Sequence, residues 1–114
     1  MAKHFGDRLC EAVKAKNSPL VVGIDPVYSR LPEEVRKSYG SGGDIEAVID
    51  ATIEFCTKTI KAVAPYVPAV KFNIAYFERF FWEGIEAYYS LIAKTDSLGL
   101  EMIGDVKRGD IGHT

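Results

Sequence analysis

The sequence has few of the residues that mark metal-binding and disulfide-rich proteins. Its 114 residues include only two cysteines and two histidines. Cys10 and Cys56 lack a Cys-x-x-Cys spacing and a nearby histidine pair, so we expect neither a metal site nor a disulfide framework. A reducing, cytoplasmic setting fits this usage best. His4 and His113 have no partner at metal-ligand spacing, and we assign them no role.

Excess positive charge and long apolar runs are also absent. The formal net charge is −2, which gives no basic surface for a nucleic acid partner. No apolar run approaches the length of a membrane span, and the first residues lack the apolar core of a signal peptide. We therefore expect a chain without nucleic acid or membrane partners, long enough for one domain with a core.

The first half of the sequence alternates helical and extended patterns. Helical spacing of apolar residues predicts a helix from Phe5 to about Asn17. The continuous apolar run 20–24 predicts a strand that is buried on both faces. The long connection that follows holds a short helical turn around 32–35. Asp44 is then a favourable N-cap for a helix that reaches about Val63.

The second half repeats the same alternation. Residues 69–72 predict a second strand, 73–95 a second amphipathic helix, and 100–104 a third strand. The predicted core face of that helix carries Phe77, Phe80, Phe81, Ile85, Tyr88, Leu91 and Ile92. Strands separated by helices imply parallel pairing with right-handed crossovers. The fold class is therefore α/β, with three parallel strands and intervening helices.

Charged residues stand at the carboxyl end of every predicted strand. These residues are Asp25, Lys71, the pair Asp105 and Lys107, and Asp110 after a turn. Parallel strands end at the same edge, where barrel enzymes gather catalytic residues from several strands. One Asp-x-Lys pair alone would be explained by a surface salt bridge, but the other charges favour an active site. Lys71 is either an edge residue that reaches solvent or an amine held by carboxylates.

Three of these segments resemble one enzyme family. Gly23-Ile-Asp-Pro26, Val70-Lys-Phe-Asn73 and the segment from Asp105-Val-Lys-Arg to Gly-Asp-Ile111 are similar, in the right order, to strand-end motifs of orotidine 5'-phosphate decarboxylase. The likeness is to its bacterial branch with longer chains. It implies a (β/α)8 TIM barrel, of which residues 1–114 are the N-terminal portion of a single domain, with the remaining strands absent from this chain.

The resemblance also implies a reaction and its catalytic residues. The enzyme converts orotidine 5'-monophosphate to uridine 5'-monophosphate in pyrimidine biosynthesis, without a metal or another cofactor. Lys107 would stabilise the developing carbanion and then protonate it as the general acid. Asp105 would lie beside the departing carboxylate. Lys71 and Asp110 would complete the catalytic set.

Substrate binding and assembly follow from the same likeness. Asp25 and Lys71 would hold the ribose hydroxyls. The enzyme would be a homodimer in which Asp110 reaches across the interface into the partner's site. Ile111 would pack near the base, and Thr114 would contact the same region.

Two other interpretations remain open. The Asp-x-Lys-x-x-Asp element is shared with metal-dependent phosphosugar decarboxylases and synthases, which tend to carry Glu where this sequence has Lys71. The chain could also be an inactive barrel fragment whose strand edges serve only for association. Arg108 would point away from Lys107 on an extended strand, and we expect it to be structural.

Overall fold

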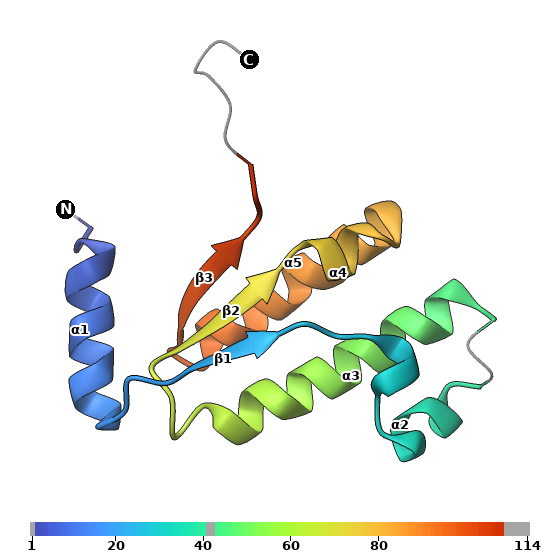
Figure 1. Cartoon of the computed structure of the whole chain (residues 1–114), viewed down its shortest axis with the longest axis horizontal. Helices are drawn as coiled ribbons and strands as arrows, with labels where there is room; N and C mark the ends of the chain where they lie inside the picture. Colours follow the sequence, from blue (N-terminus) through green and yellow to red (C-terminus); the bar gives the residue numbers. More distant parts are fainter. Residues whose placement is uncertain (1, 41–42, 109–114) are drawn as a thin grey trace, which may run out of the picture.

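The computed structural model describes residues 2–40 and 43–108 (Figure 1). In chain order the elements are α1 (Phe5–Lys16), β1 (Val21–Ile24), a 3-10 turn (Tyr28–Arg30), α2 (Glu33–Ser38), α3 (Ile45–Val63), β2 (Ala69–Asn73), α4 (Ala75–Glu78), α5 (Phe81–Ser97) and β3 (Glu101–Asp105). The strands form one parallel sheet in the order β1-β2-β3. The α/β class with three parallel strands and intervening helices is therefore confirmed.

Two helices begin at a residue whose side chain accepts a hydrogen bond from the backbone of the first turn. The carboxylate of Asp44 accepts a hydrogen bond of 3.1 Å from the backbone N–H of Glu46, which satisfies one of the free donors of α3. His4 caps α1 in the same way through Nδ1, which accepts from the N–H of Gly6 at 3.1 Å. The predicted N-cap of α3 is confirmed.

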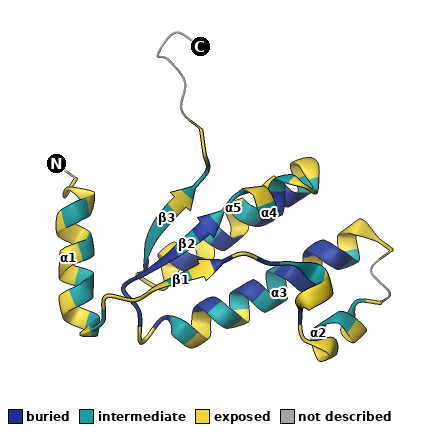
Figure 2. Ribbon diagram, in the orientation of Figure 1, coloured by how far each residue is buried: buried dark blue, intermediate teal, exposed yellow. Residues whose placement is uncertain are grey.

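The core lies between one face of the sheet and helices α3 and α5. Phe72 and Val70 of β2 pack there with Ile60 of α3 and Leu91 of α5, and all four are almost fully buried. Each such side chain contributes roughly 1.5–3 kcal/mol through burial. Figure 2 shows this buried layer as dark blue along β2 and the inner sides of α3 and α5. Cys56 of α3 is also buried in this layer.

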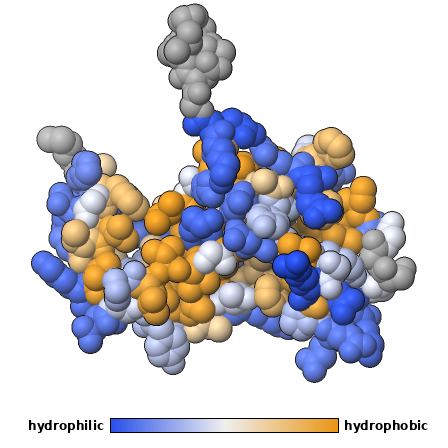
Figure 3. All heavy atoms as spheres, in the orientation of Figure 1, coloured by the Kyte–Doolittle hydropathy of each residue, from blue (hydrophilic) through white to orange (hydrophobic). Residues whose placement is uncertain are grey.

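The opposite face of the sheet is open over the first strand. Val21, which points away from the helices, is 44% exposed, and Leu20, directly before β1, is 65% exposed. The expectation that residues 20–24 are buried on both faces is therefore wrong for the described chain. The helices cover one face only, because α3 and α5 both pack on the side of Ile24 and Phe72. Figure 3 shows the resulting apolar surface over β1 and a hydrophilic surface beyond the end of β3.

The single helix predicted for residues 73–95 is also wrong, because the chain forms α4 and then α5. The break lies at Phe81, whose backbone has a left-handed φ of 56°. Gly84 then packs so closely that a Cβ on it would lie 1.9 Å from the carbonyl oxygen of Phe77. As a result Phe77 and Leu91 are buried, whereas Phe81 is 77% exposed and Ile85 is 39% exposed, against the predicted core face.

The molecule measures 46 × 41 × 20 Å, so it is a thin layer. Among the described residues, no helix has both the length and the apolar character needed to cross a membrane. Helix α1 stands beside the start of the sheet (Figure 1). It is tied to β3 by the ion pair of Arg8 with Glu101 at 3.2 Å.

Candidate active site

The sheet register brings charged side chains from three strands to one edge. Gly23 of β1 lies beside Lys71 of β2, and Asn73 of β2 lies beside Asp105 of β3. Alternate residues of a strand share a face, so Lys71 and Asp105 project from the same face. Asp25 follows directly after β1 at the same edge. We call Asp25, Lys71, Asp105 and Lys107 the strand-end array.

Charges alternate in sign along the strand-end array. The ammonium of Lys71 lies 3.8 Å from Oδ1 of Asp25 and 3.5 Å from Oδ2 of Asp105. The other oxygen of Asp105 accepts a 2.6 Å hydrogen bond from Nζ of Lys107. The order is therefore minus, plus, minus, plus. The 2.6 Å contact is a charge-assisted hydrogen bond, which is stronger than one between neutral groups.

Lys71 occupies the centre of this arrangement. It lies on β2, the middle strand, and its side chain is 33% exposed. Of the two alternatives for Lys71, a solvent-reaching edge residue or a buried amine held by carboxylates, the structure has the amine between two carboxylates but only partly buried. Lys71 on the central strand thus lies between Asp25, which follows β1, and Asp105, which ends β3.

Lys107 contacts Asp105 from a backbone conformation that is not that of a strand. The strand ends at Asp105, and Lys107 has a left-handed φ of 45° instead of extended backbone. For a residue with a Cβ this conformation costs about 1–2 kcal/mol. The side chain is 71% exposed, apart from its contact with Asp105. The two side chains therefore meet although the backbone at Lys107 is not extended.

The lysines hold Asp105 in its ionised form. The hydrogen bond from Lys107 lowers the pKa of Asp105 below its ordinary value, and the charge of Lys71 adds to the effect. Because the folded-state pKa is lowered, Asp105 contributes to stability above its ordinary pKa of about 3.9. That contribution is lost as the pH falls through the lowered value.

In the Lys107→Ala variant we therefore expect the pKa of Asp105 to rise toward its ordinary value. The variant removes the largest cause of the lowered pKa and leaves only Lys71 nearby. A carbon-13 NMR titration of the Asp105 carboxyl group measures the change. Lys58→Ala, which breaks an ion pair on α3 instead, is the control and should leave Asp105 unchanged. An identical titration in all three proteins would show that Lys107 does not hold this carboxylate.

Three predicted site residues cannot be placed. Asp110, Ile111 and Thr114 lie outside the described residues. Their roles therefore stay predictions from the sequence. Of the predicted site residues that are described, Asp25, Lys71, Asp105 and Lys107 all meet in the strand-end array.

Sequence reasoning missed one contact at this edge. Arg108 forms an ion pair with Glu78, the last residue of α4. The two residues are 30 positions apart in the chain, and no local pattern pairs them. The contact arises because α4 begins directly after β2, beside the end of β3.

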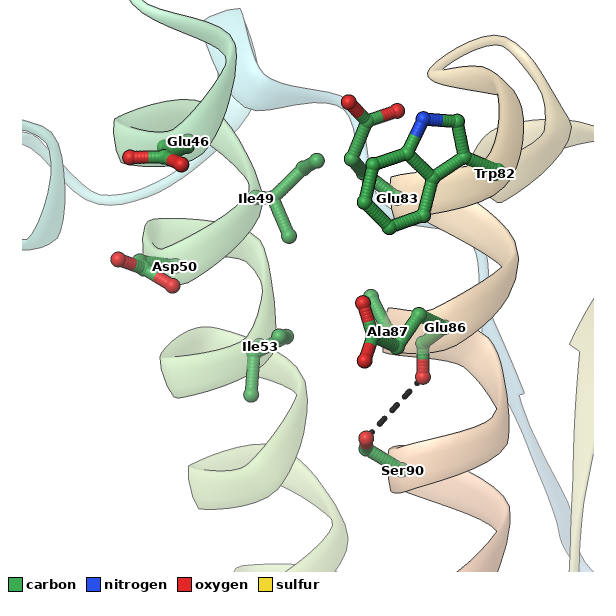
Figure 4. A pocket seen from close by; sticks show the side chains of 9 residues that line it. All are labelled: Glu46, Ile49, Asp50, Ile53, Trp82, Glu83, Glu86, Ala87 and Ser90. Atoms are coloured by element: carbon green, nitrogen blue, oxygen red, sulfur yellow. Dashed lines mark hydrogen bonds between the residues drawn. The ribbon is translucent and has the colours of Figure 1, made fainter.

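Hollows in the surface do not all coincide with the strand-end array. One of about 380 Å³ lies beside Asp25 and is also lined by Arg30, Phe55 and Tyr76. A larger groove of about 430 Å³ runs between α3 and α5. Figure 4 shows Ile49 and Ile53 in that groove, with the indole of Trp82 at one end. The groove lies on the helices, away from the charged strand ends, so it is not part of this site.

No group of three or more His, Cys, Asp or Glu side chains gathers as metal ligands within residues 2–40 and 43–108. The carboxylates of Asp25 and Asp105 face the ammonium of Lys71 instead. Nitrogen–oxygen contacts of this kind are ion pairs, and a lysine ammonium has no lone pair to offer a metal. The described part of the edge is thus built from paired charges.

Comparison with known proteins connects this geometry to one enzyme family. Over 110 residues the chain is 40% identical to an orotidine 5'-phosphate decarboxylase of Nocardioides, and over 113 residues it is 34% identical to one of Caldicellulosiruptor bescii. The matches cover 96% and 97% of this chain. The chain spans 37% of the length of each of these curated relatives. No family model matches the sequence.

Solved structures give the same result. The structure of Leishmania donovani OMP decarboxylase aligns with a TM-score of 0.70 at 32% identity, covering 96% of this chain and 36% of that one. An orotidine 5'-monophosphate decarboxylase of Plasmodium berghei aligns at 0.76 with 18% identity, covering 96% of this chain and 46% of that one, and supports the fold alone. The resemblance predicted from the sequence motifs is confirmed: nearly all of this chain matches part of an orotidine 5'-phosphate decarboxylase.

Proposed function

We propose that this chain is the N-terminal portion of a (β/α)8 barrel that decarboxylates orotidine 5'-monophosphate to uridine 5'-monophosphate and carbon dioxide. The observation that carries the proposal is the strand-end array, in which carboxylates and ammonium groups alternate across three parallel strands. The names of the relatives support the substrate. Three strands are too few to close a barrel of this kind, so the complete protein would carry the activity.

The proposed reaction breaks one carbon–carbon bond. Carbon dioxide leaves, and the bonding electron pair remains on the pyrimidine carbon. Lys107 stabilises that negative charge electrostatically and then transfers a proton to the carbon, which leaves its amine neutral. General acid catalysis requires the donor to carry the proton that it transfers, and Nζ of Lys107 donates a 2.6 Å hydrogen bond to Asp105.

The other members of the strand-end array would hold the substrate and fix the position of Lys107. Asp105, whose pKa is lowered by its lysine neighbours, would face the departing carboxylate and raise the free energy of the bound substrate. Lys71 fixes the position of Asp105 from the opposite side, at 3.5 Å. Asp25 and Lys71 would hydrogen-bond the ribose hydroxyls.

The remaining parts of the proposal concern assembly. In a homodimer, Asp110 would enter the partner's site, with Ile111 beside the base and Thr114 in the same region. These three residues follow Lys107 within seven positions of the sequence, and their roles are part of the proposal. The enzyme would work in the cytoplasm without a metal or another cofactor.

Decarboxylation of orotidine 5'-monophosphate by the complete protein tests the proposal. The loss of ultraviolet absorbance on conversion to uridine 5'-monophosphate gives the rate, and the intact mass identifies the sample. We expect turnover from the complete protein and none from a pure chain of residues 1–114, which lacks the other strands. A complete protein that binds no orotidine 5'-monophosphate would overturn the proposal. Native mass measurement of the 114-residue chain tests the alternative that it only self-associates.

The metal-dependent phosphosugar alternative has a separate test. Lys71 places a positive charge between Asp25 and Asp105, where it would repel a divalent cation. We expect turnover to persist in excess chelator. Activity that is lost with chelator and restored by magnesium would favour the alternative.

A further inference from the structure

Arg108 makes two contacts that bracket Lys107. Its Nη1 donates a 2.9 Å hydrogen bond to the carbonyl oxygen of Val106. Its Nη2 pairs with Oε1 of Glu78. One guanidinium therefore ties the backbone just before Lys107 to the end of α4.

Helix α4, which carries Glu78, is itself fixed to the sheet by hydrogen bonds at its start. Helix α4 begins where the side chain of Asn73 accepts a 3.1 Å hydrogen bond from the N–H of Ala75. The N–H of Ile74 donates to the carbonyl oxygen of Asp105 at 3.3 Å. Segments that follow two neighbouring strands are thus joined by backbone and side-chain contacts.

The backbone at Lys107 is the reason such a tie matters. Its left-handed φ of 45° is unfavourable for a residue with a Cβ and persists only where surrounding contacts enforce it. The described contacts that flank Lys107 are those of Arg108, together with its own hydrogen bond to Asp105. Without them the backbone at Lys107 is free to leave this conformation, and the ammonium would lose its fixed position beside Asp105.

We infer that Arg108 and Glu78 are positioning residues that hold Lys107 in the strand-end array. This inference rests on the proposed function, in which Lys107 delivers the proton. Both side chains are partly exposed, at 65% and 34%, and exposed ion pairs add little to folding stability. Their effect is therefore expected on the rate of the chemical step, which depends strongly on donor placement.

The geometry also distinguishes arginine from lysine at position 108. A planar guanidinium donates to the Val106 carbonyl with one nitrogen and to Glu78 with another. A lysine ammonium is a single point on a flexible stem and does not reproduce that fork. A positive charge at position 108 is thus not enough to make both contacts; the guanidinium is needed.

The test uses four variants of the complete protein: Arg108→Ala, Arg108→Lys, Glu78→Gln and the double variant Glu78→Gln with Arg108→Ala. We expect kcat to fall by roughly 100-fold in Arg108→Ala and nearly as much in Arg108→Lys and Glu78→Gln. KM and the melting temperature should change little. The double variant should be no slower than Arg108→Ala, because both changes break one interaction.

Glu33→Gln is the matched control, since it breaks the exposed Lys37–Glu33 pair on α2, and it should keep the parent kcat. Parent-like kcat in the Arg108 and Glu78 variants would overturn the inference. A kcat loss that only follows a lower melting temperature would also overturn it. Lys107→Ala is assayed in parallel. If that variant retains turnover, the proposed function fails. If Lys107→Ala is inactive while the Arg108 variants keep parent-like turnover, only the positioning role is refuted.

Discussion

Replacing Lys107 with alanine in the complete protein is expected to lower kcat for decarboxylation by roughly 10⁴-fold. The variant loses the proton donor and also the positive charge beside the developing carbanion. Asp105 would keep only Lys71 as a cationic neighbour, so less positive charge would offset its repulsion of the substrate carboxylate. Single-turnover assays at saturating substrate measure the chemical step directly.

The fold should survive this change, because Lys107 is 71% exposed and lies beyond the end of β3. A melting temperature equal to that of the parent would establish this. Lys94→Ala, which removes an exposed lysine from α5, is the matched control and should retain full turnover. If Lys107→Ala kept a kcat within tenfold of the parent, another group would have to be the proton donor.

The strands and their charged ends were predictable because each depends on local sequence. Apolar runs flanked by turns defined the three strands, and parallel strands necessarily end at one edge. Asp25, Lys71 and Asp105 therefore had to meet once the order of elements was known. The sequence also supplied the cap of α3, since Asp44 acts on a backbone group two residues away.

Features that depend on contacts distant in sequence were not predictable. The break between α4 and α5 arises from the approach of Gly84 to the backbone of Phe77, and helical periodicity continues through it. The left-handed turn at Lys107 and the pairing of Arg108 with Glu78 depend on where α4 ends. Burial on both faces was predicted for the first strand because a run of apolar residues cannot say which faces the rest of the fold covers.

The break between α4 and α5 leads to a large expected effect on stability. Gly84→Ala should lower the free energy of unfolding by about 3 kcal/mol. The added Cβ would lie 1.9 Å from the carbonyl oxygen of Phe77 and 2.9 Å from its carbonyl carbon. Both are backbone atoms, so relief requires the two helices to separate and to open the core around Phe77. Urea denaturation of the complete protein measures the loss.

The sign of this effect makes the test specific. In an ordinary helix interior, glycine to alanine is stabilising by about 1 kcal/mol. Ala93→Gly on the exposed side of the same helix is the control and should cost about that amount. A Gly84→Ala variant that is as stable as the parent would show that α4 and α5 do not pack as described.

The same substitution should also affect the site. Since Phe77 immediately precedes Glu78, separation of the helices would draw Glu78 away from Arg108. A reduced kcat well below the melting temperature would then link the packing of Gly84 to the placement of Lys107.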